Sequence, residues 1–269
     1  MSQTLTIGRF LDIRIGIHVS WLAVYLFLTY SIAGELDGIG RPIAFVLGAL
    51  CALALFASVV FHEFAHALVA RRFGVNTQAI TLFLFGGVAT LESEPPSPGS
   101  EVAVALAGPA ASGLLALLAF GVLRLLDHVL HGAMGDAIAL LVAYLAIANG
   151  VLAVFNLLPS FPMDGGRVLR AALWRLGRSH ARATATATLV GIVLAVAVLA
   201  GGVVLLVLDR AWQDGWYILL GSFLCIQSIA AYRIARRAVA AEGLDADAAR
   251  NATVPCPTQS PRSATIAAH

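Results

Sequence analysis

The sequence has 269 residues, of which 59% are hydrophobic and only 12% are charged. Soluble domains carry about 25% charged residues, so this composition excludes an ordinary soluble protein and predicts an integral membrane protein. The net charge of +2 at pH 7 gives no reason to expect a nucleic-acid partner. The 3 cysteines fit neither a disulfide framework nor a cysteine-based metal site.

Six stretches of the chain are apolar enough to cross a bilayer. They are residues 15–33, 42–70, 101–124, 137–158, 183–208 and 216–232. The first stretch exceeds the roughly 7 to 15 apolar residues of a signal peptide, so we expect a transmembrane helix there. We therefore predict an all-α polytopic membrane protein with one six-span domain over residues 1–237. Residues 238–269 are polar with little periodicity, and we expect a disordered cytoplasmic tail.

The second predicted span contains the run His62-Glu63-Phe64-Ala65-His66. Positions i and i+4 of a helix lie on one face, so His62 and His66 can bind one metal ion, with Glu63 beside the open coordination position. This pattern is typical of zinc metalloproteases. Alternatively, the three side chains are satisfied polar groups between packed helices. Ionisable groups at bilayer depth cost about 2.5 to 3.5 kcal/mol each on insertion scales, which favours a functional reason for three of them.

A short apolar segment, residues 80–88, follows the second span and is rich in strand-forming residues. It is too short to cross the membrane as a helix, and Gly86-Gly87 predicts a turn or bulge. We therefore expect a short membrane-associated β segment after the second helix. An edge strand from Ile80 to Phe85 can hold an extended peptide by strand addition.

The arginines are distributed unequally between the two sides of the predicted topology. Excluding the two in the far tail, twelve lie on the side of the termini, and three, Arg41, Arg124 and Arg210, lie on the other. The twelve are Arg9, Arg14, Arg71, Arg72, Arg167, Arg170, Arg175, Arg178, Arg182, Arg233, Arg236 and Arg237. By the positive-inside rule, the termini and the ends of the second and fourth spans face the cytoplasm.

This topology limits the choice of a third metal ligand, because acidic residues at the far face lie about a bilayer thickness from His66. The acidic residues on the near side are Asp12, Glu92, Glu94, Glu101 and Asp164. The acidic residues of the tail are weaker candidates. We prefer Asp164, because it follows the fourth span in a turn constrained by Pro159 and Pro162, and Gly165-Gly166 allow a sharp turn. The alternative is that Asp164 only caps the next helix.

With these motifs the sequence resembles the site-2 protease family of intramembrane zinc metalloproteases, in a minimal six-span form without PDZ or CBS domains. The matching motifs are His62-Glu63-x-x-His66, Gly108-x-x-x-Ser112 in the third span, and Asn156-x-x-Pro159-x-x-Pro162-x-Asp164-Gly165 after the fourth. The middle motif taken alone also fits simple helix packing.

The resemblance implies roles for individual residues. It implies that His62, His66 and Asp164 hold one Zn2+ per chain, and that Glu63 is the catalytic carboxylate. Asn156 would help to bind the substrate or the developing oxyanion. The strand-like segment would pair with the unwound substrate, and its expected substrate-binding residues are Phe83, Phe85, Gly86 and Gly87.

The resemblance also implies a function, namely cleavage of a transmembrane protein substrate near the cytoplasmic side of a bacterial cell membrane. Such regulated intramembrane proteolysis acts on an anti-sigma factor or another membrane-bound regulator. The sequence leaves the substrate, the regulation and the oligomeric state open. The alternative is a zinc-binding membrane transporter or sensor that uses the same ligands without hydrolysis. A transport route would repeat polar groups across the bilayer, whereas the far halves of these spans are nearly free of charge.

Overall fold

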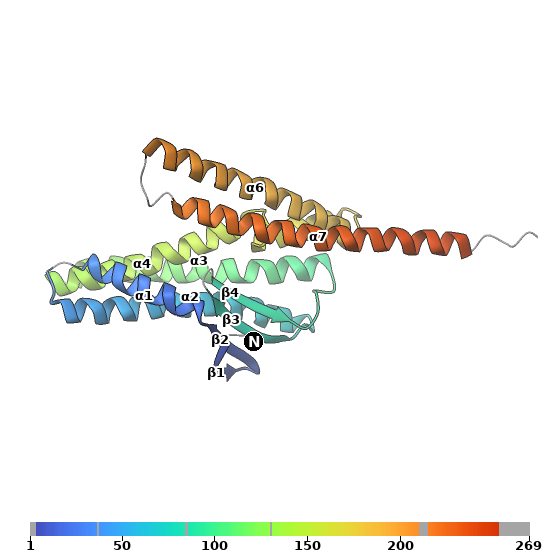
Figure 1. The fold of residues 1–269 in the computed structure, drawn as a ribbon. Helices are drawn as coiled ribbons and strands as arrows, with labels where there is room; N and C mark the ends of the chain where they lie inside the picture. The colour runs from blue at the N-terminus through green and yellow to red at the C-terminus, as the bar shows by residue number, and fades with distance from the viewer. Residues whose placement is uncertain (1–3, 37, 84–85, 130, 210–214, 253–269) are drawn as a thin grey trace, which may run out of the picture.

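The computed structural model describes residues 4–36, 38–83, 86–129, 131–209 and 215–252, and it consists of helices with one small sheet. The elements in chain order are β1 (Thr4–Phe10), β2 (Ile13–His18), α1 (Ser20–Gly34), α2 (Arg41–Arg72), β3 (Thr77–Phe83), β4 (Gly86–Leu91), α3 (Pro98–Val129), α4 (Ala133–Asn156), α5 (Asp164–Arg175), α6 (His180–Asp209) and α7 (Gly215–Ala252). In Figure 1 helices α1 to α4 run side by side, the sheet lies against one end of this group, and the α6–α7 pair lies on its other side.

Five of the described helices, α2, α3, α4, α6 and α7, are long and apolar enough to cross a membrane. They correspond closely to the last five predicted spans, which confirms a polytopic α-helical membrane protein. Helix α1 has only 15 residues. At 1.5 Å per residue it is about 22 Å long, less than the ~30 Å hydrocarbon core, so the predicted count of six spans is approximate.

The predicted first span, residues 15–33, begins too early. Residues 13–18 form β2, which pairs with β1 in an antiparallel hairpin. The connecting residues Leu11 and Asp12 both have positive φ, 49° and 68°, as a two-residue hairpin turn requires. The sequence prediction missed this hairpin because an apolar strand and the helix after it form one continuous hydrophobic run.

The described strands form one sheet in the order β1-β2-β3-β4, with β2 parallel to β3 and β3 antiparallel to β4. The predicted β segment after α2 is therefore confirmed as the β3–β4 hairpin. The prediction that Ile80 to Phe85 forms an edge strand is wrong for Ile80 to Leu82, because these residues pair with both β2 and β4. The edge strands of this sheet are β1 and β4.

The sheet packs on one face of α2, and this packing sets the direction in which the opposite face of α2 points. Ile13 of β2 and Ile80 of β3 form a buried cluster with Phe64 and Ala67 of α2. Since helical residues repeat every 3.6 positions, Phe64 and Ala67 lie opposite His62 and His66. Burial of Phe64 against the sheet therefore turns both histidines away from it, toward α3.

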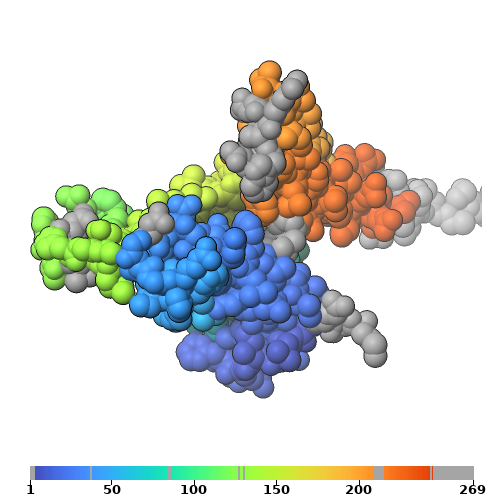
Figure 2. All heavy atoms as spheres, turned by 60° about the vertical axis from the view of Figure 1, so that its left-hand side comes forward, coloured from blue at the N-terminus to red at the C-terminus, as the bar shows by residue number. Residues whose placement is uncertain are grey.

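The α6–α7 pair joins the rest of the molecule through α5, which packs on both α3 and α6, and through a buried cluster with Phe155 and Met163. Figure 2 shows this pair rising away from α1 and α2. Helix α7 continues to Ala252, so residues 238–252, where we expected a disordered tail, are described as helix, in keeping with the high helix propensity of this alanine-rich stretch. Residues 253–269 lie outside the described residues.

Candidate active site

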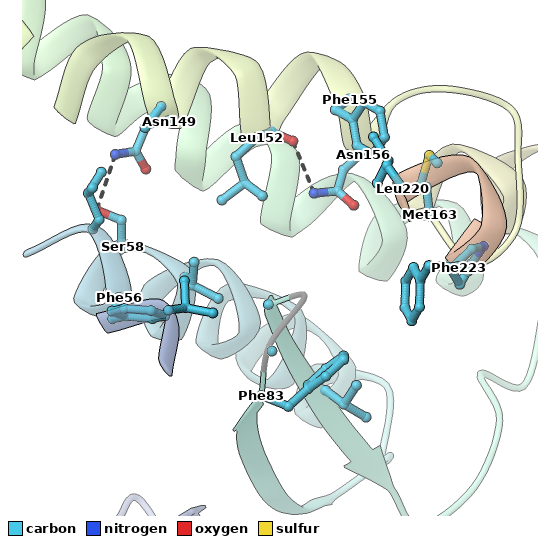
Figure 3. Close-up of a pocket in the computed structure, with 18 of the residues that line it drawn as sticks. Phe56, Ser58, Phe83, Asn149, Leu152, Phe155, Asn156, Met163, Leu220 and Phe223 are labelled. Atoms are coloured by element: carbon cyan, nitrogen blue, oxygen red, sulfur yellow. Dashed lines mark hydrogen bonds between the residues drawn. The ribbon is translucent and has the colours of Figure 1, made fainter. Parts of the chain in front are cut away.

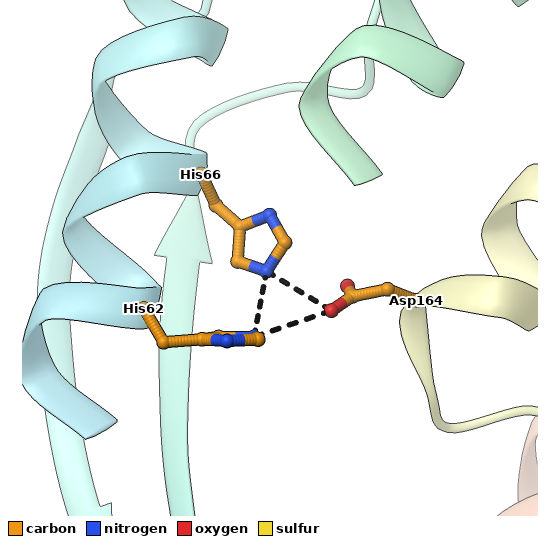
Figure 4. Close-up of side chains that lie close together, drawn as sticks. All are labelled: His62, His66 and Asp164. Carbon is orange, nitrogen blue, oxygen red and sulfur yellow. Dashed lines mark hydrogen bonds and ion pairs between the residues drawn. The ribbon is translucent and has the colours of Figure 1, made fainter. Parts of the chain in front are cut away.

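Three buried side chains from two distant parts of the chain converge in the structure. His62 Nε2 lies 3.3 Å from Asp164 Oδ2, His66 Nε2 lies 3.1 Å from the same oxygen, and the two imidazole nitrogens are 3.1 Å apart. The residues are only 3%, 5% and 8% exposed, respectively. Figure 4 shows both rings directed from α2 toward the carboxylate at the start of α5.

The spacing of these three atoms suits a tetrahedral metal site. Metal–ligand bonds of about 2.0 to 2.1 Å at tetrahedral angles place the ligand atoms about 3.3 Å apart, close to the observed separations. Two imidazoles and one carboxylate are also a common ligand set for catalytic zinc, with one position left for water or substrate. Among the described residues, these three form the group of potential metal ligands.

The four other acidic candidates for the third ligand are engaged elsewhere. Asp12 lies 3.7 Å from Arg9, and Glu92 accepts a hydrogen bond from Asn76. Glu101 is buried and paired with Arg170, whose Nε donates to Glu101 Oε1 at 2.6 Å. Glu94 lies 2.9 Å from His180 Nε2 and 3.7 Å from the Arg170 guanidinium.

Helix α3 holds both imidazoles in the form that binds a metal. His66 Nδ1 donates to the Val104 carbonyl at 2.6 Å, and His62 Nδ1 lies 2.9 Å from the fully buried Ser112 hydroxyl. The Val104 carbonyl can only accept, which requires the His66 proton on Nδ1, and the Ser112 hydroxyl can accept the same proton from His62; in that form the lone pair of each Nε2 points toward Asp164. The sequence reading missed this role of Ser112, although its spacing from Gly108 was visible.

Gly108 makes room for the two histidines. A Cβ at this position would collide with the Nε2 atoms of both His62 and His66. Any side chain here would therefore occupy the space where the three ligand atoms meet. Thus Gly108 of the Gly108-x-x-x-Ser112 motif lets the two imidazoles approach α3 closely, and Ser112 forms a hydrogen bond with His62.

Asp164 is placed by the tight junction between α4 and α5. Cβ atoms on Gly165 and Gly166 would collide with backbone of the preceding turn, at Leu157–Leu158 and Ser160–Phe161, respectively. Neither glycine has positive φ, so the sharp turn expected from the sequence does not explain them. Glycine is needed at both positions because the neighbouring backbone approaches so closely.

The Asp164 carboxylate has different surroundings at its two oxygens. Oδ2 faces the imidazoles, and Oδ1 lies 3.9 Å from the Arg167 guanidinium. Burial raises the pKa of the Asp164 carboxyl, but without a metal the two imidazoles can donate from Nε2 to Oδ2, and these hydrogen bonds outweigh burial and lower the pKa to about 2. Asp164 is therefore ionised at neutral pH, as a metal ligand must be.

Glu63 lies next to His62 on α2, close to the start of β4. A Cβ on Gly87 would lie 2.8 Å from Glu63 Cγ, so the glycine allows the strand to approach this carboxylate. The Glu63 carboxylate is also close enough to interact electrostatically with His66 and Asp164. Gly87, the second residue of the predicted Gly86-Gly87 pair, thus borders the candidate catalytic carboxylate.

A largely apolar cavity of about 670 Å³ lies beside this site, between α1, α2, the β3–β4 hairpin, α4 and α7. Four of the predicted catalytic and substrate-binding residues line it, namely Phe83, Gly86, Gly87 and Asn156. Asn156 ends α4, and its Nδ2 donates to the Leu152 carbonyl at 3.0 Å (Figure 3). Phe85 lies outside the described residues.

The chain matches the profile of peptidase family M50 over residues 50–132 and 128–199. A Mycobacterium tuberculosis protein named as zinc metalloprotease Rip3 is 39% identical over 230 residues, which cover 83% of this chain and 57% of that protein. A Synechocystis protein named as zinc metalloprotease sll0528 is 35% identical over 263 residues, covering 95% of this chain and 66% of that protein. The chain thus spans less than two thirds of the length of these relatives.

Among solved structures, the chain resembles the site-2 protease from Methanocaldococcus jannaschii, with a TM-score of 0.59 and 27% sequence identity. The match covers 85% of this chain and 95% of that one. Since the family profile covers more than half of the chain and the fold agrees, the chain belongs to peptidase family M50 and has the fold of a site-2 protease.

Proposed function

We propose that this protein is an intramembrane zinc metalloprotease that hydrolyses a peptide bond within or near the transmembrane segment of a membrane protein. The observation that carries the proposal is the convergence of His62, His66 and Asp164 beside Glu63, next to an apolar cavity among membrane-spanning helices. Relatives named as zinc metalloproteases support the same reaction.

The three ligand side chains fit zinc. Their donor set, separations and burial match a catalytic zinc site, and Ser112 and Val104 supply the outer hydrogen bonds that such ligands require. When bound, zinc lowers the pKa of a coordinated water toward about 7 and polarises the scissile carbonyl.

The remaining chemistry belongs to Glu63 and Asn156. We assign Glu63 as the general base, which accepts a proton from the attacking water and passes it to the departing amine. The Asn156 side chain can turn from the Leu152 carbonyl and donate to the oxyanion, a contribution of about 3 kcal/mol in a dry site. Its position on the cavity wall supports this role.

The substrate must be extended to be cut, because a helix occupies its own amides and carbonyls. The edge of β4 is suited to strand addition, because β3 is already paired on both sides. Gly86 and Gly87 at the start of β4, with Phe83 opposite Gly86, would bring such a strand next to Glu63.

We further propose that the site opens toward the cytoplasm of a bacterial cell. The arginine distribution supports this orientation for the multi-pass protein. The substrate would be an anti-sigma factor, which proteolysis destroys, or another membrane-bound regulator, which proteolysis releases.

Replacement of Glu63 by Gln tests the proposal. The Glu63→Gln variant should retain zinc at the wild-type level, because Glu63 is not a ligand, and should lose proteolysis. Transmembrane fragments should accumulate in membranes of cells that carry the variant, and wild-type protein should remove them. Unchanged cleavage would remove Glu63 from the mechanism. Zinc flux across proteoliposomes without any cleavage would favour a transporter.

A further inference from the structure

Helix α4 carries a second asparagine on the cavity wall, Asn149, two turns before Asn156. Both side chains line the cavity, and Figure 3 shows them on the same side of α4. Asn149 is only 2% exposed and lies in a membrane-spanning helix, where an amide needs hydrogen-bond partners.

The hydrogen bonds of Asn149 fix the orientation of its amide. Nδ2 donates to the Leu145 carbonyl at 2.9 Å and to Ser58 Oγ at 3.1 Å. The Leu145 carbonyl can only accept, so the nitrogen must face it. The Ser58 hydroxyl donates to the Ala54 carbonyl at 3.0 Å, so its oxygen is free to accept from Asn149.

This arrangement uses both protons of Nδ2 and leaves Oδ1 without a partner. Among the described residues no group bonds to Asn149 Oδ1, although the atom is buried. A buried carbonyl oxygen without a donor costs about as much as a lost hydrogen bond. Because Oδ1 is an acceptor only, its missing partner must be a donor.

We propose that Asn149 Oδ1 binds a backbone N–H of the substrate where the transmembrane segment is unwound in the cavity. An intact helix cannot supply this donor from its interior, because each of its amides is already bonded. Asn149 would thus select substrates that unwind at this depth. This inference rests on the proposed proteolytic function and adds a specificity residue to it.

The spacing of the two asparagines predicts which substrate amide is bound. Seven helical residues separate Asn149 from Asn156, a rise of about 10 Å along α4. An extended peptide covers that distance with about three residues. If Asn156 contacts the scissile peptide, the N–H bound by Asn149 lies roughly three residues away, on the side deeper in the membrane.

The test uses a synthetic leucine- and alanine-rich transmembrane peptide of about 20 residues in phosphatidylcholine nanodiscs. In a series of such peptides, one backbone amide at a time is replaced by an ester, which removes only the N–H. Apart from esters in the stretch that pairs with β4, wild-type enzyme should show a sensitive ester about three residues from the cleavage site, on the side deeper in the membrane, with KM raised about tenfold and kcat nearly unchanged.

The Asn149→Leu variant should raise KM for the all-amide peptide about tenfold and should no longer distinguish that ester. Ser58→Ala is the matched control, because it removes a partner of Nδ2 and leaves Oδ1 in place. It should retain the wild-type ester profile. Zinc content and thermal unfolding of both variants check that the fold is intact.

Several outcomes would overturn the inference. A wild-type scan without a sensitive ester at that spacing refutes it even if Asn149→Leu does not fold. If the raised KM of the ester peptide persists in Asn149→Leu, the substrate amide does not bind Oδ1, and water is the partner of that atom. If Ser58→Ala reproduces the Asn149→Leu defect, Asn149 acts in helix packing and not in substrate binding. If wild-type protein cleaves no peptide, the proposed function fails, while binding of the same esters to Glu63→Gln still tests Asn149.

Discussion

Replacement of Gly108 by Ala should empty the metal site without unfolding the protein. The added methyl group would point from α3 into the space between the two imidazoles, where it meets both Nε2 atoms. Alanine is the better helix former by about 1 kcal/mol, so α3 itself is not weakened. The Gly108→Ala substitution therefore tests the geometry of the site apart from the stability of the helix.

The size of the effect follows from the distances. The methyl carbon would lie 2.5 Å from His62 Nε2, whereas ordinary contact begins at 3.4 Å, so the ring must retreat by about 0.9 Å. Metal–ligand bonds tolerate deviations of only about 0.2 Å. We therefore expect a loss of zinc affinity of at least 100-fold, or about 2.8 kcal/mol.

Zinc content measured by mass spectrometry, together with chelator competition, would give the affinity of the purified variant. The matched control is Gly113→Ala on the same helix, where an added methyl group meets nothing within 4 Å. Gly113→Ala should keep full zinc content and proteolysis. A Gly108→Ala variant with wild-type zinc content and turnover would refute the assignment of Gly108 as the residue that gives the metal its space.

Two other substitutions test the contacts around the site. Ser112→Ala removes the partner of His62 Nδ1 and should weaken zinc binding by about 10- to 100-fold in chelator competition, and unchanged affinity would contradict the role of Ser112. Arg170→Met leaves the Glu101 carboxylate buried without its partner and should lower the free energy of unfolding by about 3 to 5 kcal/mol. The double variant Glu101→Met/Arg170→Met should recover most of this loss in denaturant unfolding, and a double variant no more stable than the single would argue against a buried ion pair.

The metal pair was predictable because its geometry is local. His62 and His66 lie one turn apart on a helix, so their relative placement depends only on helical periodicity. Asp164 is 98 residues beyond His66, yet the arginine distribution placed both near one membrane face. Topology thus narrowed the third ligand to a few acidic residues. The choice among them rested on the turn and the family resemblance.

The N-terminal hairpin was not predictable in the same way. Residues 13–18 are stabilised as a strand by β1 and by the parallel neighbour β3, which lies beyond two helices in the sequence. Within a continuous apolar run, local propensity does not separate such a strand from the start of a helix. The same dependence on distant partners explains why Ile80 to Leu82 was expected at an edge and lies inside the sheet.

Helix α3 supplies none of the three proposed ligand side chains and yet holds the elements that carry them. Through Gly108 and Ser112 it sets the distance and orientation of the imidazoles from α2, and through Glu101 it binds Arg170 on the helix that begins with Asp164. Ligand positions in a metal site must be held within a few tenths of an ångström. Since α3 contacts both ligand-bearing helices at buried points, small changes along its buried face should alter zinc affinity more than similar changes on α6, which contacts α5 and the turn before it and no ligand-bearing segment of α2 among the contacts described.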